Sequence, residues 1–214
     1  MDGMKNSAGK PVLLKMVSAI QKNKDYLSEV DGLIGDGDHG MNMNKGFTLF
    51  GDQIRDKEIS FTDGLNELGN LLFSKIGGSM GPIYGTVFMG MAGAGEKFEL
   101  IDGAAFAAML DAGLTDLGDV VEAKVGDKTL VDTLSPANDA LQKAVKEGKS
   151  FPEALVIMKA AAEAGRDSTK DLAAKLGRSS RLGERSRGVL DAGAVSCCII
   201  LISMADGILE QLKA

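Results

Sequence analysis

Three aspartates separated by glycines are the part of the chain best suited to chemistry. Asp31, Asp36 and Asp38 lie in the run Asp31-Gly-Leu-Ile-Gly-Asp36-Gly-Asp38-His39-Gly-Met-Asn42. Carboxylates this close repel one another unless a cation binds them. Mg²⁺ prefers oxygen ligands and usually completes its shell with waters and substrate phosphates. The spacing therefore predicts a magnesium site in a phosphate-handling protein, with an ordinary polar turn as the alternative.

Other kinds of site fit these residues poorly. In an EF-hand alignment that starts at Asp36, position five is Gly40 and position twelve is Phe47, so the bidentate anchor of a calcium loop is missing. His39 is the single histidine, which excludes multi-histidine zinc sites and makes a Ser-His-Asp hydrolase hard to assemble. His39 can act as a base, donate to a phosphate or simply be satisfied beside the aspartates. We therefore assign no catalytic residue.

Two further segments have the composition of anion-binding loops. The turn Gly77-Gly-Ser-Met-Gly-Pro82 leads directly into a predicted helix, whose free amides and positive dipole end favour a phosphate, although an ordinary helix start looks the same. The polar interval 163–191 carries a cluster of arginines between Arg178 and Arg187. This interval indicates either disorder or an ordered anion-binding loop, in which Arg178 is the best candidate for a phosphate clamp.

The known nucleotide-binding motifs of α/β proteins are absent. Gly126-Asp-Lys-Thr129 resembles the end of a P-loop but has the wrong residue before its lysine. Gly93-Ala-Gly95 lacks the third glycine of a dinucleotide fingerprint, and no strand precedes it. A nucleotide, if bound, therefore needs another fold.

Composition predicts one domain, residues 1–214. The chain has 214 residues, 44% of them hydrophobic, and a formal net charge of -6, which argues against a nucleic-acid partner. The only cysteines, Cys197 and Cys198, lie in an apolar run and are interpreted as small core residues in a reducing compartment. Lys15 interrupts the only apolar run near the N-terminus, and no stretch approaches a membrane span. We expect a soluble, cytoplasmic protein with no membrane partner.

Hydrophobic periodicity predicts an all-α protein. Apolar residues recur at spacings of three and four, and alternating β-branched runs are rare. Pro82 and Pro152 suit the first turns of helices. Glycine, proline and capping residues divide the chain into eight predicted helices, near 10–28, 40–56, 61–76, 82–98, 103–122, 129–147, 152–174 and 192–213.

Taken together, these motifs resemble the L subunit of dihydroxyacetone kinase. The resemblance spans nearly the whole chain, with the motifs in the family's order. It implies a barrel of eight antiparallel amphipathic helices, with a nucleotide (ADP or ATP) and two Mg²⁺ ions held by loops at one end. The segments that carry it are Gly35-Asp36-Gly-Asp38-His39-Gly-Met-Asn42-Met-Asn44, Gly77-Gly-Ser-Met-Gly-Pro82, Gly126-Asp-Lys-Thr129, Gly177-Arg178-Ser-Ser through Leu182-Gly-Glu-Arg-Ser186, and Asp191-Ala-Gly193.

The same resemblance implies roles for individual residues. Asp31, Asp36 and Asp38 would be the magnesium ligands. The residues expected around the nucleotide are His39, Gly40, Met41 and Asn42 at the phosphates, Ser79 and Met80 at the second glycine turn, Leu130 in the base pocket, and Arg178, Asp191, Ala192 and Gly193 closing over it.

The resemblance also implies partners. In this family a separate K subunit binds the small ketone covalently through its own histidine, and the L subunit presents the nucleotide. In many bacterial systems an M subunit of the phosphotransferase system rephosphorylates the bound ADP. We therefore expect phosphoryl donation to dihydroxyacetone or a similar short hydroxyketone. A chain without an obvious nucleophile suits this role, because phosphoryl transfer needs mostly positioning and charge neutralisation.

The chain departs from the family pattern around the expected nucleotide. Met80 stands where serine is common, Val121 where glycine is usual, Arg181 where tyrosine is usual and Ala192 where proline is usual, and residues 187–190 also differ. These changes alter the loop cover of the site, whereas the aspartates are kept.

Two other readings stay open. Fatty-acid kinase nucleotide domains carry a similar Asp-Gly-Asp-x-Gly-x-Asn-Met motif, usually in longer chains, so a kinase of another substrate class or another sugar is one alternative. A regulatory module, in which nucleotide state tunes binding to a transcriptional regulator or to the other subunits, is the second. Failure to phosphorylate dihydroxyacetone with any K subunit would separate the regulatory module from the kinase.

Overall fold

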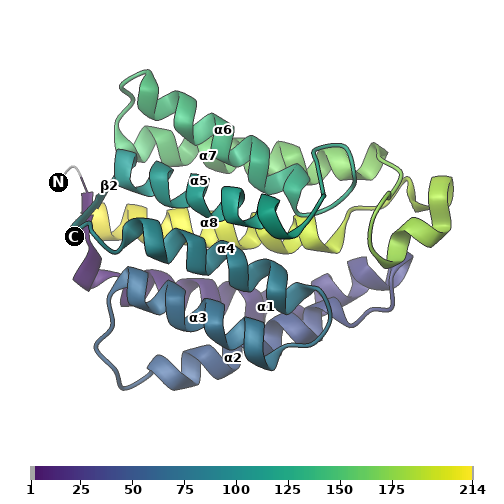
Figure 1. Ribbon diagram of the computed structural model, residues 1–214, viewed down its shortest axis with the longest axis horizontal. Coiled ribbons are helices and arrows are strands. Elements are labelled where there is room, and N and C mark those ends of the chain that lie inside the picture. The colour runs from purple at the N-terminus through teal and green to yellow at the C-terminus, as the bar shows by residue number, and fades with distance from the viewer. Residues whose placement is uncertain (1–2, 214) are drawn as a thin grey trace.

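The computed structural model describes residues 3–213, which form an all-α protein with eight α-helices lying along a common direction (Figure 1). Two short strands, β1 (Gly3–Lys5) and β2 (Leu100–Asp102), pair antiparallel, and three short 3-10 segments are η1 (Asn6–Ala8), η2 (Thr169–Asp171) and η3 (Arg178–Ser186). The α-helices are α1 (Lys10–Ile34), α2 (His39–Ile54), α3 (Phe61–Lys75), α4 (Met80–Gly95), α5 (Gly103–Val120), α6 (Val131–Lys146), α7 (Phe151–Ser168) and α8 (Ala192–Lys213).

The helices close into a ring. Each α-helix contacts the next one in the chain, and α8 contacts α1. The starts of α1 and α3 meet, since a Cβ added to Gly9 would lie 2.6 Å from the Cα of Phe61. The starts of α5 and α7 meet likewise, where Gly103 lies against Phe151. The odd-numbered helices therefore begin at one end and the even-numbered helices at the other, as expected for an antiparallel helical barrel.

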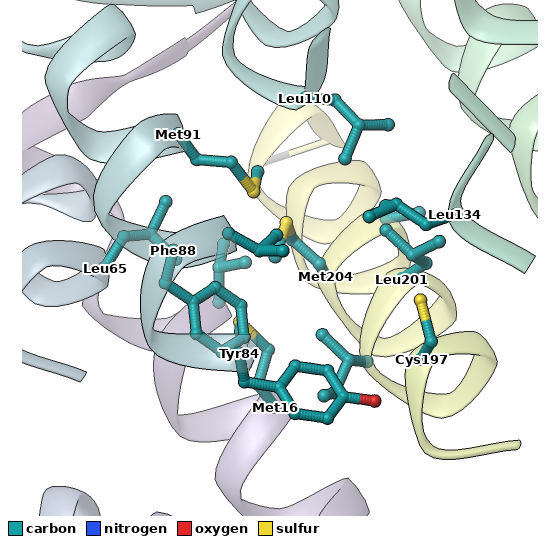
Figure 2. Close-up of a cluster of buried hydrophobic side chains, with 14 of the residues drawn as sticks. Met16, Leu65, Tyr84, Phe88, Met91, Leu110, Leu134, Cys197, Leu201 and Met204 are labelled. Carbon is teal, nitrogen blue, oxygen red and sulfur yellow. The ribbon is translucent and has the colours of Figure 1, made fainter. Parts of the chain in front are cut away.

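The inside of the ring is filled by apolar side chains (Figure 2). Phe88 is 1% exposed, and its ring centroid lies 6.1 Å from that of Tyr84 and 6.3 Å from that of Phe47. Met91 on α4 and Met204 on α8 point into the same cluster (Figure 2). This burial is the main stabilising contribution that holds the eight helices together.

Local sequence signals fix several helix starts. The Ser60 Oγ accepts a hydrogen bond from the Asp63 amide at 3.1 Å, and an Asp102 carboxylate oxygen accepts one from the Ala105 amide at 2.8 Å. Ser150 forms a capping box with Glu153 at the start of α7. Pro82 and Pro152 lie in first turns, as predicted.

The most apolar helix, α8, corrects one sequence-based expectation. Its 22 residues include an 18-residue window with a mean hydropathy of 2.0, long and apolar enough to cross a membrane by length and composition. The expectation that no stretch approaches a membrane span was therefore wrong. Because 72% of that window is buried inside the protein, the apolar composition is that of a central core helix. Cys197 and Cys198 are buried free thiols on it, as predicted.

Several boundaries also differ from the sequence-based prediction. The first helix continues past residue 28 to Ile34, which places Asp31 in its last turn. The seventh helix ends at Ser168 instead of residue 174, and the polar interval that follows is ordered through η2 and η3. The two strands were not predicted, because three-residue strands leave too little alternation to detect.

Candidate functional site

A pocket of about 570 Å³ opens at the end of the ring where the even-numbered helices begin. It is lined by Asp31, Ile34, Gly35, Asp36, Asp38, His39, Asn42, Gly77, Gly78, Ser79, Met80, Ile83, Tyr84, Val121, Ala123, Lys128, Thr129, Leu130, Leu176, Gly177, Arg178, Ser179, Asp191, Ala192 and Gly193. The lining residues fall in five segments, 31–42, 77–84, 121–130, 176–179 and 191–193, so folding assembles the pocket from parts distant in sequence.

The aspartate cluster forms one wall of the pocket. One carboxylate oxygen from each of Asp31, Asp36 and Asp38 lies within 4.8 Å of the other two, a spacing that suits a shared cation. The turn is made possible by Gly37, which has a φ of 77°. Arg178 forms an ion pair with Asp36, and its guanidinium lies 3.8 Å from Asp38. The guanidinium of Arg178 therefore partly neutralises the carboxylate cluster.

Three helix N-termini supply free backbone amides to the same pocket. The first backbone hydrogen bonds of these helices run from the amide of Asn42 to Asp38 in α2, from Ile83 to Ser79 in α4 and from Val195 to Asp191 in α8. The amides that precede Asn42, Ile83 and Val195 in the first turns therefore have no backbone acceptor within the helix, although carboxylates already accept from His39 and Ala194, and Pro82 has no N–H. Together with the helix dipoles, they make this end of the ring a favourable place for an anion.

His39 belongs to a buried hydrogen-bonded chain. Its Nε2 lies 2.8 Å from the Ser196 Oγ, which lies 2.6 Å from the Tyr84 hydroxyl, and the Tyr84 hydroxyl donates to the Gly193 carbonyl at 3.2 Å. The His39 amide donates to Asp31 at 3.3 Å. Burial lowers the pKa of His39 despite the attraction of Asp31, so the neutral ring is favoured. The chain connects the starts of α2, α4 and α8.

A second polar group, the half-buried carboxylate of Asp191, lies at the start of α8. The Asp191 carboxylate accepts a hydrogen bond from the Ala194 amide at 2.8 Å and so caps the helix. Burial raises the pKa of Asp191 to about 7, although the Ala194 amide and the nearby Lys128 ammonium oppose the shift. Burial also lowers the pKa of Lys128, against the attraction of Asp191 and Asp132.

Part of the pocket lining is apolar. It is formed by Ile34, Met80, Ile83, Val121, Ala123, Leu130 and Leu176. Met80 and Val121 are two of the residues that depart from the family pattern, and both replace a smaller residue with a larger apolar one. A flat, weakly polar group such as a nucleobase is the kind of ligand that an apolar wall beside a polar one accommodates.

Most of the residues singled out from the sequence meet at this pocket. The lining includes the three aspartates together with His39, Asn42, Ser79, Met80, Leu130, Arg178, Asp191, Ala192 and Gly193. Gly40 and Met41 are not among the lining residues. Gly40 is buried against α1, where an added Cβ would lie 1.9 Å from the Lys24 carbonyl oxygen, and the Met41 side chain is 56% exposed.

Sequence reasoning gave no role to four residues at or beside the pocket: Tyr84, Lys128, Thr129 and Ser196. Tyr84 follows the second glycine turn, and Lys128 and Thr129 belong to the Gly126–Thr129 segment, so their motifs were a usable signal. Ser196 gave none, because it stands inside an apolar run and its hydroxyl finds Tyr84 only through packing.

Comparison with known proteins agrees with this picture. Residues 33–206 match the family model described as the DAK2 domain. The chain is 37% identical over 186 residues to the PEP-dependent dihydroxyacetone kinase 1, ADP-binding subunit DhaL, of Listeria innocua, covering 86% of this chain and 88% of the relative. It is 35% identical over 184 residues to the PEP-dependent dihydroxyacetone kinase, ADP-binding subunit DhaL, of Escherichia coli, covering 85% and 87%.

A solved structure shares the fold. The crystal structure of the dihydroxyacetone kinase from C. freundii in complex with AMP-PNP and Mg²⁺ superposes with a TM-score of 0.73 and 20% identity, covering 96% of this chain and 35% of that chain. The resemblance to the L subunit is confirmed by the relatives, and the expected all-α barrel by the fold. The chain belongs to the DAK2-domain family, which includes the DhaL subunits of dihydroxyacetone kinases.

Proposed function

We propose that this chain binds ADP or ATP with Mg²⁺ and is the phosphoryl-donating subunit of a dihydroxyacetone kinase. The observation that carries the proposal is one pocket that combines three carboxylates, three helix N-termini and apolar lining residues. The carboxylates fit a hard cation, the amides fit phosphate oxygens and the apolar residues fit a base. The relatives named as ADP-binding subunits and the AMP-PNP and Mg²⁺ complex of the fold neighbour support it.

The residues of the chain would divide the work of binding between them. Asp31, Asp36 and Asp38 would hold two Mg²⁺ ions, which when bound neutralise phosphate charge. His39, Gly40, Met41 and Asn42 would bind phosphate oxygens at the start of α2, and Ser79 and Met80 would do so at the start of α4. Gly40 and Met41 can take part only through their backbone amides, because their side-chain positions do not line the pocket.

The remaining site residues would orient and enclose the nucleotide. Leu130 would contact the base, while Asp191, Ala192 and Gly193 would hold the start of α8 against it. Arg178 would move from the carboxylates toward the phosphates, since a guanidinium binds either anion. We assign no nucleophile or general base to the chain, because positioning and charge neutralisation suffice for phosphoryl donation.

The acceptor and partners follow from the same assignment. A separate K subunit would hold dihydroxyacetone or a similar short hydroxyketone covalently, and an M subunit of the phosphotransferase system would rephosphorylate bound ADP in the cytoplasm. The relatives named as PEP-dependent kinase subunits support an assembly of several chains.

Two measurements test the proposal. Denaturing the purified protein and identifying released nucleotide by mass spectrometry would detect resident ADP, which is the result expected if it is rephosphorylated in place. Purified K subunit, dihydroxyacetone and a phosphoryl donor are then added, and formation of the phosphorylated ketone is measured. Binding of Mg²⁺-nucleotide without any transfer would leave a regulatory module and refute the donor role.

A further inference from the structure

The Gly126–Thr129 segment contains a lysine that the proposed function leaves unused. The Lys128 side chain is 1% exposed, although a buried ammonium group is costly unless its donors are satisfied. Lys128 has a φ of 63° and is the only non-glycine residue with positive φ in the described range 3–213. Backbone strain of this kind persists where the surrounding structure requires it.

The ammonium of Lys128 binds backbone, not an acid. Its Nζ donates to the Thr169 carbonyl and, at 2.5 Å, to the Val189 carbonyl. Among the described residues, no carboxylate lies within salt-bridge distance of it. The Thr169 and Val189 carbonyls are far apart in sequence, so the Lys128 ammonium holds these two residues close together in space.

These two points are the ends of one loop, residues 170–188, which we call the cover loop. Its ends are also bonded to each other, because the Gly188 amide donates to the Lys170 carbonyl at 2.8 Å. Just outside it, the Asp191 amide donates to the Thr169 Oγ1 at 3.0 Å. The position of a loop with adjoining ends depends on how those ends are held. The cover loop contributes Leu176, Gly177, Arg178 and Ser179 to the pocket.

The loop that carries Lys128 is itself firmly built. The Asp132 carboxylate accepts hydrogen bonds from the amides of Gly126 at 2.6 Å and Thr129 at 2.7 Å. The Lys175 amide donates to the Asp127 carbonyl at 3.2 Å, which adds a second contact with the cover loop. Lys128 therefore projects from a hydrogen-bonded turn, and its ammonium binds the carbonyls at both ends of the cover loop.

We infer that Lys128 is a positioning residue, whose buried ammonium fastens both ends of the cover loop and thereby holds Arg178 and Asp191 at the pocket. Its effect on a nucleotide rests on the proposed function, whereas the anchoring of the loop does not. A lysine serves better here than a neutral side chain, because hydrogen bonds from a charged donor to carbonyls are stronger.

The anchoring is tested first without any nucleotide. Lys128→Met keeps the Cβ and nearly the length of the side chain, so the strain at φ 63° is unchanged and only the ammonium is lost. Amide hydrogen exchange in chelator is compared with that of Lys170→Met, a matched control with an exposed lysine in the cover loop. We expect the amides of Ala174, Lys175 and Gly188 to exchange about tenfold faster in Lys128→Met alone.

Amide hydrogen exchange in other helices shows whether Lys128 positions the cover loop or stabilises the whole protein. Protection in α3 and α4 should stay as in the unmodified chain, whereas a merely structural lysine would loosen all helices together and lower the melting temperature in proportion. Unchanged exchange of the cover loop would overturn the inference. If Lys128→Met does not fold, Lys128→Gln decides: it shortens the side chain and removes its charge, so it should speed exchange at the same loop ends, and unchanged exchange would overturn the inference.

The consequence for the nucleotide is measured as a dissociation rate. Fluorescently labelled ADP with Mg²⁺ should leave Lys128→Met about tenfold faster than Lys170→Met, because the loop that carries Arg178 opens more often. Equal dissociation rates would overturn the positioning role. If the unmodified chain retains no labelled nucleotide, the proposed function fails, while the exchange experiment still decides whether Lys128 anchors the loop.

Discussion

Asp191 offers a sharp prediction, because burial and charge oppose one another at this residue. Its pKa is raised from 3.8 to about 7, so the folded protein holds the proton more tightly than the unfolded chain does. A group with a raised folded pKa stabilises the fold fully below its unfolded pKa, and this contribution is lost as the pH rises toward the folded value. The loss therefore falls between about pH 4 and about pH 7, and little further change is expected above it.

Asp191→Asn removes this titration and leaves an oxygen that can still accept from the Ala194 amide. With the two pKa values above, the free energy of unfolding of the original chain falls by about 2 kcal/mol between pH 5.5 and pH 8 through this one group. The variant lacks that loss. The free energy of unfolding of the variant minus that of the original chain should therefore be about 2 kcal/mol larger at pH 8 than at pH 5.5.

Urea denaturation in the presence of chelator, at both pH values, measures the effect. The control is Asp119→Asn, which removes the same charge from an exposed position at the end of α5. All other titrating groups are shared by the chains and cancel in the comparison. An Asp191→Asn difference that is the same at pH 5.5 and pH 8 would show that Asp191 is ionised throughout, and the reasoning from burial would be wrong.

Three further predictions follow from the site and the core. Asp38→Asn should abolish Mg²⁺-dependent nucleotide binding in titration calorimetry, and retained affinity would refute the metal assignment. The melting temperature in chelator should not fall, because each solvent-screened carboxylate pair repels by roughly 1 kcal/mol. Gly40→Ala should destabilise by about 2 kcal/mol in urea, since its Cβ would meet the Lys24 carbonyl oxygen at 1.9 Å, whereas Gly118→Ala, with open space around it, should not. Phe88→Ala, at a ring 1% exposed, should cost about 3–5 kcal/mol by the same assay, and a loss under 1 kcal/mol would contradict its place in the core.

The helices could be predicted from sequence because their signals are local. Apolar spacing and first-turn prolines act within one helix, so the start of α3 at Phe61 and the span of α8 were placed correctly. The end of α1 was not, because Asp31-Gly32 is typical of a loop, although Leu27, Val30 and Ile34 keep the apolar spacing of the earlier turns. The last turns of α1 run beside the start of α2, where Gly40 lies against Lys24 and Ser28.

The acidic half of the site was predictable for the same reason, whereas contacts between distant segments were not. Asp31, Asp36 and Asp38 are neighbours in the chain, so their mutual repulsion is visible in the sequence. Arg178 was singled out from the sequence as a candidate phosphate clamp, but its ion pair with Asp36 joins segments far apart in the chain and was not predicted. Lys128 was compared with a P-loop lysine and set aside, because nothing in a sequence tells which carbonyls a buried ammonium will find.

The polarity of the ring gives a physical reason for the proposed metal and phosphate sites to coincide at this end. In an antiparallel ring all even-numbered helices begin at the same end, so the positive dipole ends of α2, α4 and α8 face one pocket. The same rule places the C-terminus of α1 there, with its negative dipole end and Asp31 in its last turn. A cation is therefore favoured beside α1 and an anion a short distance away, beside the even-numbered helices. A metal-bound polyphosphate has this arrangement of charge, and neither a free cation nor a free anion would use both halves of the pocket.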